Sequence, residues 1–170
     1  MGTARRKTAV HPKPSRAASQ LPPRSATKPP LWTCPRCGKK FVTRNIYHSC
    51  GPYTVADFLR GKGPKGRALF RRFESLLRAC GPVTVAPNKT GIAFMVRVRF
   101  AGVRRVSDRG MTFAFALLRR IESPRIAKVE QYGKWYGHIV RVTEPGQLDD
   151  EVLRWLRESY RVGEQRHLYG

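Results

Sequence analysis

Apolar and polar residues alternate with two periodicities along the chain, and these predict its helices and strands. From Lys65 to Cys80 the apolar residues recur at helical spacing, and Gly81-Pro82 gives this helix a stop. From residue 83 to residue 142 the pattern changes to a period of two, which is typical of strands. A second helical stripe runs from Leu148 to Tyr160. The predicted fold class is therefore α+β, an antiparallel sheet flanked by helices.

The period-two region consists of short apolar runs separated by turn residues. The predicted strands are Val83–Ala86, Ile92–Phe100 with an extended continuation to Val106, Met111–Leu118, Ile126–Glu130 and Trp135–Val142. Short turns between such strands predict an antiparallel meander. Within Met111–Leu118, large residues alternate with Thr112, Ala114 and Ala116. These small side chains predict that something packs closely on their face of the sheet.

Residues 53–64 are predicted to form a short helix and a linker. Thr54 is suited to cap a helix that runs through Arg60, and the glycines from Gly61 to Gly66 break it. This basic glycine loop lacks the Gly-Lys-Ser/Thr ending of a phosphate-binding loop, so we interpret it as a flexible linker. The α+β domain then covers residues 65–163, and residues 164–170 form a tail.

Residues 31–52 form a compact unit rich in cysteine and histidine. Cys34 and Cys37 have the Cys-x-x-Cys spacing that puts two thiolates on one side of a turn, and His48 and Cys50 follow. Three thiolates and an imidazole match the tetrahedral ligand set of Zn²⁺. The sequence therefore predicts a zinc finger, with the aromatic rings of Trp32 and Phe41 covering the metal.

The spacing of His48 and Cys50 leaves alternatives open. Two residues apart, they face away from each other on a regular helix or strand, so they share a metal only where the chain turns, as Gly51-Pro52 allows. The other interpretations are a Cys34–Cys37 redox pair, or a three-ligand site completed by a distant histidine. A closed four-ligand site would be structural, because it has no position for a substrate.

The charge of the chain is strongly one-sided. Lys and Arg number 34 against 11 Asp and Glu, the formal net charge is +23, and Asp57 is the first acidic residue. Residues 1–30 contain seven basic residues, six prolines and no aromatic residue, which predicts a disordered basic arm. A positive charge of this size favours binding to polyanions, and we expect DNA or RNA as the partner. The alternative interpretation of the charge is that it only keeps the protein in solution.

The candidate contacts to nucleic acid are basic residues of the finger and of the domain. They are Arg36, Lys39, Lys40 and Arg44 in the finger, and Arg71, Arg72, Arg97, Arg99, Arg104 and Arg105 in the domain. No apolar run is long enough for a membrane helix, and no apolar block typical of a secretory signal is present. Clustered cysteines that suit a metal better than disulfides predict a cytoplasmic protein.

Support for an enzyme is scarce in the sequence. It lacks a Gly-x-Ser-x-Gly elbow, and residues 1–110 offer only three carboxylates, too few for the cluster of a metal-dependent nuclease. The second hypothesis is a protein-interaction or small-ligand module whose pocket contains Arg119, Trp135, Tyr136 and His138. His138 alone favours a structural role over a general base. An enzyme of unrecognised type is the third hypothesis.

The finger motif also resembles a known family. Trp-x-Cys-Pro-x-Cys-Gly-x-x-Phe from Trp32 to Phe41, then Asn-x-x-His-Ser-Cys from Asn45 to Cys50, resembles the N-terminal finger of small bacterial proteins of domain of unknown function 5655. The resemblance covers about residues 31–163. It implies a zinc finger joined to an α+β domain, with no assigned activity. Related domains are similar to ones that follow predicted nuclease domains, which points to work on nucleic acid. With the basic arm and the Arg-rich surface, the leading hypothesis is a non-enzymatic nucleic-acid-binding protein.

Overall fold

The computed structural model describes residues 27–46 and 48–169. Most of the predicted arm, residues 1–26, lies outside the described residues. The helices are α1 (Val55–Leu59), α2 (Pro64–Arg78), α3 (Asp150–Gly163) and α4 (Arg166–Tyr169), with a 3₁₀ turn at Pro145–Gln147. The strands are β1 (Trp32–Thr33), β2 (Lys40–Phe41), β3 (Thr84–Pro87), β4 (Ile92–Met95), β5 (Arg99–Ser107), β6 (Gly110–Leu117), β7 (Ile126–Tyr132) and β8 (Trp135–Val142). The α+β class predicted from the sequence is confirmed.

Strands β3 to β8 form one antiparallel sheet, and its order differs from a meander. The order is β3-β4-β5-β6-β8-β7, so β8 lies between β6 and β7. Residues 111–117 of β6 pair with residues 136–142 of β8 along their whole length. Strand β7 therefore lies at the edge of the sheet. The connection between β6 and β7 therefore skips the position next to β6, and β8 occupies that position.

The predicted strand from Ile92 to Phe100 is wrong in one respect, because the chain turns back in its middle. Strand β4 ends at Met95, which pairs with Arg99 at the start of β5. The backbone N–H groups of Arg97 and Val98 donate to the carbonyl of Gly163, at 3.2 and 3.1 Å. A contact with the end of α3 thus replaces the sheet hydrogen bonds that the period-two pattern predicts.

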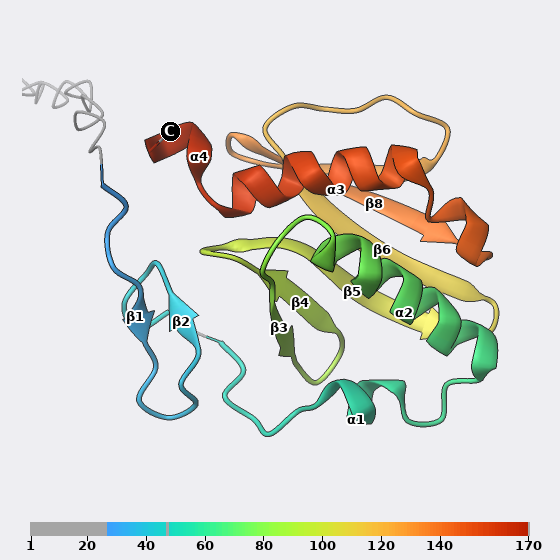
Figure 1. The fold of residues 1–170 in the computed structure, drawn as a ribbon, viewed down its shortest axis with the longest axis horizontal. Coiled ribbons are helices and arrows are strands. Elements are labelled where there is room, and N and C mark those ends of the chain that lie inside the picture. Colours follow the sequence, from blue (N-terminus) through green and yellow to red (C-terminus); the bar gives the residue numbers. More distant parts are fainter. Residues whose placement is uncertain (1–26, 47, 170) are drawn as a thin grey trace, which may run out of the picture.

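Helices α2 and α3 cover one face of the sheet, and the core lies between them and the strands (Figure 1). Aromatic rings form its centre: Phe73 of α2 packs 4.5 Å from Phe113, and Trp155 of α3 stacks 5.7 Å from Phe115. Phe113 and Phe115 belong to β6 and are buried on the same face, as the alternation predicts. Cys80 is half-buried and packs beside this core.

The helices begin at caps that the sequence supplies. Thr54 and Asp57 form a capping box at α1, and the side chain of Asp149 caps α3. Pro64 is the first residue of α2, and the N–H of Gly66 in its first turn donates to Asp108 at 2.8 Å. A carboxylate therefore lies beside this glycine-rich segment, which is unfavourable for phosphate. Among the described helices, none has the length and hydropathy to span a bilayer.

The second face of the sheet carries Thr112, Ala114, Ala116 and Gly137. We expected something to pack closely on it. Instead, Ala114 and Ala116 contribute to a hollow of about 340 Å³. In the part of the chain that the structure describes, both large helices belong to the other face, so we call this second surface the open face.

Ser159 of α3 joins the two layers and gives a prediction about stability. Its buried hydroxyl donates to the carbonyl of Phe100 at 2.7 Å and accepts from the N–H of Ala116 at 3.1 Å, where the β5–β6 ladder ends. Ser159→Ala should lower the free energy of unfolding by about 1–3 kcal/mol, because two backbone groups lose their partner in a dry site. Urea denaturation measures this. Ser75→Ala on the exposed side of α2 is the control, and an equal loss there would contradict the prediction.

Candidate metal centre

Four side chains of the finger, Cys34, Cys37, His48 and Cys50, lie together as a candidate metal site. Their ligand atoms are all within 4.8 Å of one another, and the group could hold a metal ion. The β1–β2 hairpin carries the first two, with Trp32 opposite Phe41 in its register. Gly38 adopts a left-handed φ of 69°, which a residue with a Cβ rarely takes, and its N–H donates to the carbonyl of Cys34 at 2.9 Å.

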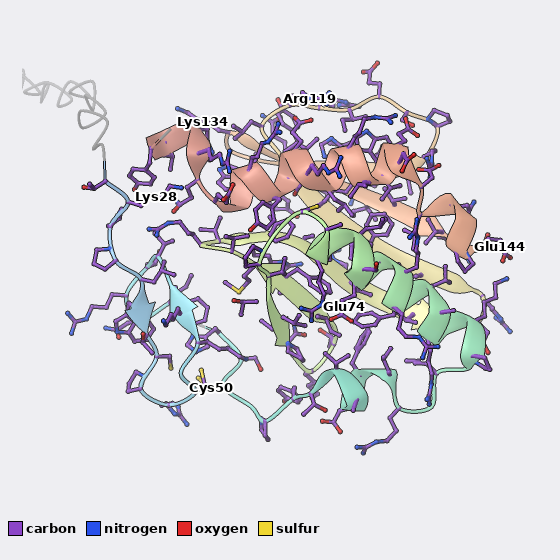
Figure 2. The ribbon with its side chains drawn as sticks, viewed as in Figure 1. Lys28, Cys50, Glu74, Arg119, Lys134 and Glu144 are labelled. Atoms are coloured by element: carbon purple, nitrogen blue, oxygen red, sulfur yellow. The ribbon has the colours of Figure 1, made fainter. Side chains whose placement is uncertain are left out.

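The distances within this cluster fit one tetrahedral metal ion. The sulfurs of Cys34 and Cys50 are 3.8 Å apart, and Nε2 of His48 lies 3.2 Å from Cys37 Sγ and 3.1 Å from Cys50 Sγ. Two sulfurs that each bind one ion at about 2.3 Å in tetrahedral geometry lie about 3.8 Å apart. The donor set and its spacing therefore suit a metal. Figure 2 labels Cys50 in the segment that follows β2.

A hydrogen bond orients the imidazole of His48 toward the sulfurs. Its Nδ1 lies 2.7 Å from the carbonyl of Ile46, so Nδ1–H is the donor and Nε2 keeps a free lone pair. The ring of Phe41 packs 4.3 Å from the imidazole, and Trp32 meets it edge-on at 6.5 Å. These two rings cover the cluster as the sequence predicts. The carbonyl of Ile46 is a partner that no residue pattern could identify.

Crowding of three sulfurs sets their protonation. Desolvation raises the pKa of the Cys34 thiol, but hydrogen bonds from the backbone of Arg36 and Cys37 outweigh it and lower the pKa to about 6. Desolvation and the neighbouring sulfurs raise the pKa of Cys50 to about 11. The thiolate of Cys34 is thus stabilised, whereas ionisation of Cys50 beside it is unfavourable. A bound cation would remove that cost.

Comparison with known proteins identifies the larger part of the chain. The family described as a domain of unknown function (DUF5655) matches residues 55–163, more than half of the sequence. The chain belongs to this family. No curated protein and no solved structure matches it. The match begins at α1, so the finger precedes the DUF5655 domain.

The predicted basic residues lie on several parts of the molecule. The finger carries four of them, and Arg71 and Arg72 belong to α2 in the opposite layer. Arg97 lies in the turn between β4 and β5, where its guanidinium donates to Gln165 and to the carbonyl of Pro29. A bulge between Val103 and Arg105 leaves Arg104 outside the regular β5–β6 register. Arg105 pairs with Thr112 of the open face, and Arg104 lines the hollow there, so two consecutive arginines share one face.

The four residues of the predicted ligand pocket do not converge. Trp135 lines the hollow on the open face, whereas Tyr136 and His138 alternate with it and belong to the helix-covered face. His138 is fully buried, stacks on Phe115 and accepts the N–H of Ile121 at 2.9 Å. Burial lowers its pKa, as expected for a neutral structural histidine. Arg119 pairs with Glu158 of α3. Tyr132, which no pattern in the sequence indicates as functional, lines the hollow beside Trp135.

Loss of one ligand should empty the metal site without unfolding the DUF5655 domain. Cys37→Ser should abolish the roughly one equivalent of metal expected per chain, which elemental analysis of purified protein measures. The thermal midpoint of the domain should stay within a few degrees, because its buried core contains no residue of the finger. Cys80→Ser is the matched control and should keep the metal. Full metal content in Cys37→Ser would contradict the site.

Proposed function

We propose that the protein is a non-enzymatic nucleic-acid-binding protein with a structural zinc ion in its finger. The preference for zinc follows from the donor set. Three thiolates and one imidazole in tetrahedral spacing suit Zn²⁺ better than cations that prefer oxygen ligands, such as Mg²⁺ and Ca²⁺. With all four positions filled by protein, the ion would hold residues 31–52 together and perform no chemistry. As part of this proposal we assign residues 1–30 to a basic arm, 31–52 to the finger, 53–64 to a helix and linker, 65–163 to the α+β domain and 164–170 to a tail.

The observation that carries the nucleic-acid proposal is which basic residues form ion pairs with the carboxylates. Within the described residues, ion pairs join acidic residues to Arg119, Arg125, Lys128 and other basic residues. None of these ion pairs involves any of the ten predicted contacts. Positive charge that forms no ion pair within the protein is suited to phosphate.

The finger and the open face lie next to each other, so their charges can act together. A hollow of about 410 Å³ separates them, with Phe41 and His48 of the finger on one side and Met95 and Arg99 of the sheet on the other. Arg99 also lines the hollow of the open face. This arrangement favours one continuous basic surface made by the finger, Arg99, Arg104 and Arg105. Arg71 and Arg72 would lie outside it.

Salt dependence tests this proposal. Binding to a generic oligonucleotide should weaken by on the order of a thousandfold between low and moderate salt if several phosphates are contacted. Arg104→Glu and Arg105→Glu should each weaken binding and reduce the salt slope by about one or more. The slope is measured by fluorescence anisotropy of a labelled strand over a salt series.

Arg71→Glu is the matched control for this experiment, because it makes the same charge change on the opposite layer. Its effect should be small, since charges farther apart than about 10 Å are screened at 0.1 M salt. Equal effects of Arg71→Glu and Arg104→Glu would refute the open face as the binding surface. Absence of any salt-dependent binding to DNA or RNA would refute the function itself.

A further inference from the structure

The hollow on the open face has a small-residue floor and functional groups at its rim. Ala114, Ala116 and Gly137 form part of the floor over about 340 Å³. The lining also includes the aromatic residues Tyr132 and Trp135 and the basic residues Arg99 and Arg104. The small side chains leave room above the strands for a flat molecule.

Tyr132 presents a fixed aromatic ring to solvent. The residue is 60% exposed, an unusual state for a large ring. Its ring passes over Gly137, where an added Cβ would lie 3.4 Å from Cε2. Its hydroxyl donates to Glu130 at 2.6 Å, and Lys128 donates to the other oxygen of that carboxylate at 2.7 Å. The ring is therefore held in place before any ligand binds, and the charge of Glu130 is compensated.

Trp135 lies beside Tyr132, and contact with a neighbouring side chain also holds its ring in place. The two residues are direct partners in the β7–β8 register. Because direct partners point to the same face of a sheet, both rings belong to the open face. His167 of α4 meets the indole edge-on, with ring centres 5.7 Å apart. Two preorganised aromatic rings thus lie at one end of the hollow.

Arg99 and Arg104 bring positive charge to the same hollow. The guanidinium of Arg99 lies across Gly102, where a Cβ would come within 2.9 Å of Nη2. Within the described residues, no hydrogen bond or ion pair is found for either guanidinium. Desolvation and the charge of Arg104 lower the pKa of Arg99, so the charge of Arg99 is placed at some electrostatic cost. An anion between them would relieve that repulsion.

We propose that this hollow binds a nucleotide of a single strand, with its base stacked on Tyr132 and Trp135 and its phosphate on Arg99 and Arg104. Aromatic rings on a sheet surface stack with unpaired bases, whereas a paired base within a duplex offers no free face. This inference rests on the proposed function and gives it a strand preference and a site. It is tested with probes that separate stacking from charge.

The experiment compares three probes at fixed salt: a thymidine homopolymer of about 12 nucleotides, an abasic strand of equal length, and the homopolymer annealed to its complement. Wild type should bind the thymidine strand more tightly than either other probe. Tyr132→Ala should weaken binding of the thymidine strand about tenfold, the amount expected from one lost stack, and leave the abasic strand unchanged. Arg99→Gln should weaken both strands, because both carry phosphate.

Two controls distinguish stacking from structural damage. Tyr132→Phe keeps the ring and loses only the hydrogen bond to Glu130, so it should retain most of the binding. Tyr53→Ala removes another exposed tyrosine, one that does not line the hollow, and should bind like wild type. Thermal melting checks that each variant is folded.

The results separate this inference from the proposed function. Wild-type binding with equal losses for Tyr132→Ala on the thymidine and abasic strands would overturn the stacking site while leaving nucleic-acid binding intact. The same holds if the duplex binds as tightly as the single strand. No binding of any probe would overturn both.

Discussion

A continuous stack of aromatic rings holds the DUF5655 domain together and sets which face of its sheet the helices cover. Phe73, Phe113, Phe115 and Trp155 connect α2, the middle of the sheet and α3 through ring contacts of 4.5 to 6.3 Å. Loss of one such ring typically costs about 3–5 kcal/mol. Because the stack draws both long helices to one face, no long helix among residues 27–46 and 48–169 covers the other face. The exposed arginines and aromatic rings of the open face follow from that asymmetry.

The finger is stabilised by different means. Its two strands have two residues each, and among its described hydrophobic side chains only Phe41 and the candidate ligand Cys34 are buried. A segment this small cannot offset its chain entropy by apolar burial. Four convergent ligands replace a core, and the metal that we propose there would supply the missing free energy. The aromatic rings of Trp32 and Phe41 then serve to keep the cluster dry, not to fold the segment alone.

The sequence predicts those features that depend on local pattern. The helical stripes, the strand around Phe113 and the ligand set of the finger all follow from spacing or residue type. Contacts between distant segments are not encoded in this way. The turn at Arg97 depends on Gly163. The position of β8 between β6 and β7 depends on whether β7 or β8 pairs with the free edge of β6. The pocket prediction failed for a simpler reason: Trp135 and His138 are three residues apart on a strand and therefore face opposite sides.

The contact between the β4–β5 turn and Gly163 has a consequence for synthesis of the chain. Arg97 and Val98 are made long before Gly163, the carbonyl of which receives both of their amides. While the ribosome is still making α3, this turn has no acceptor, and the aromatic face of β6 lacks Trp155. The sheet therefore reaches its final packing only after Gly163 has left the ribosome, and until then its apolar strands lack part of their cover.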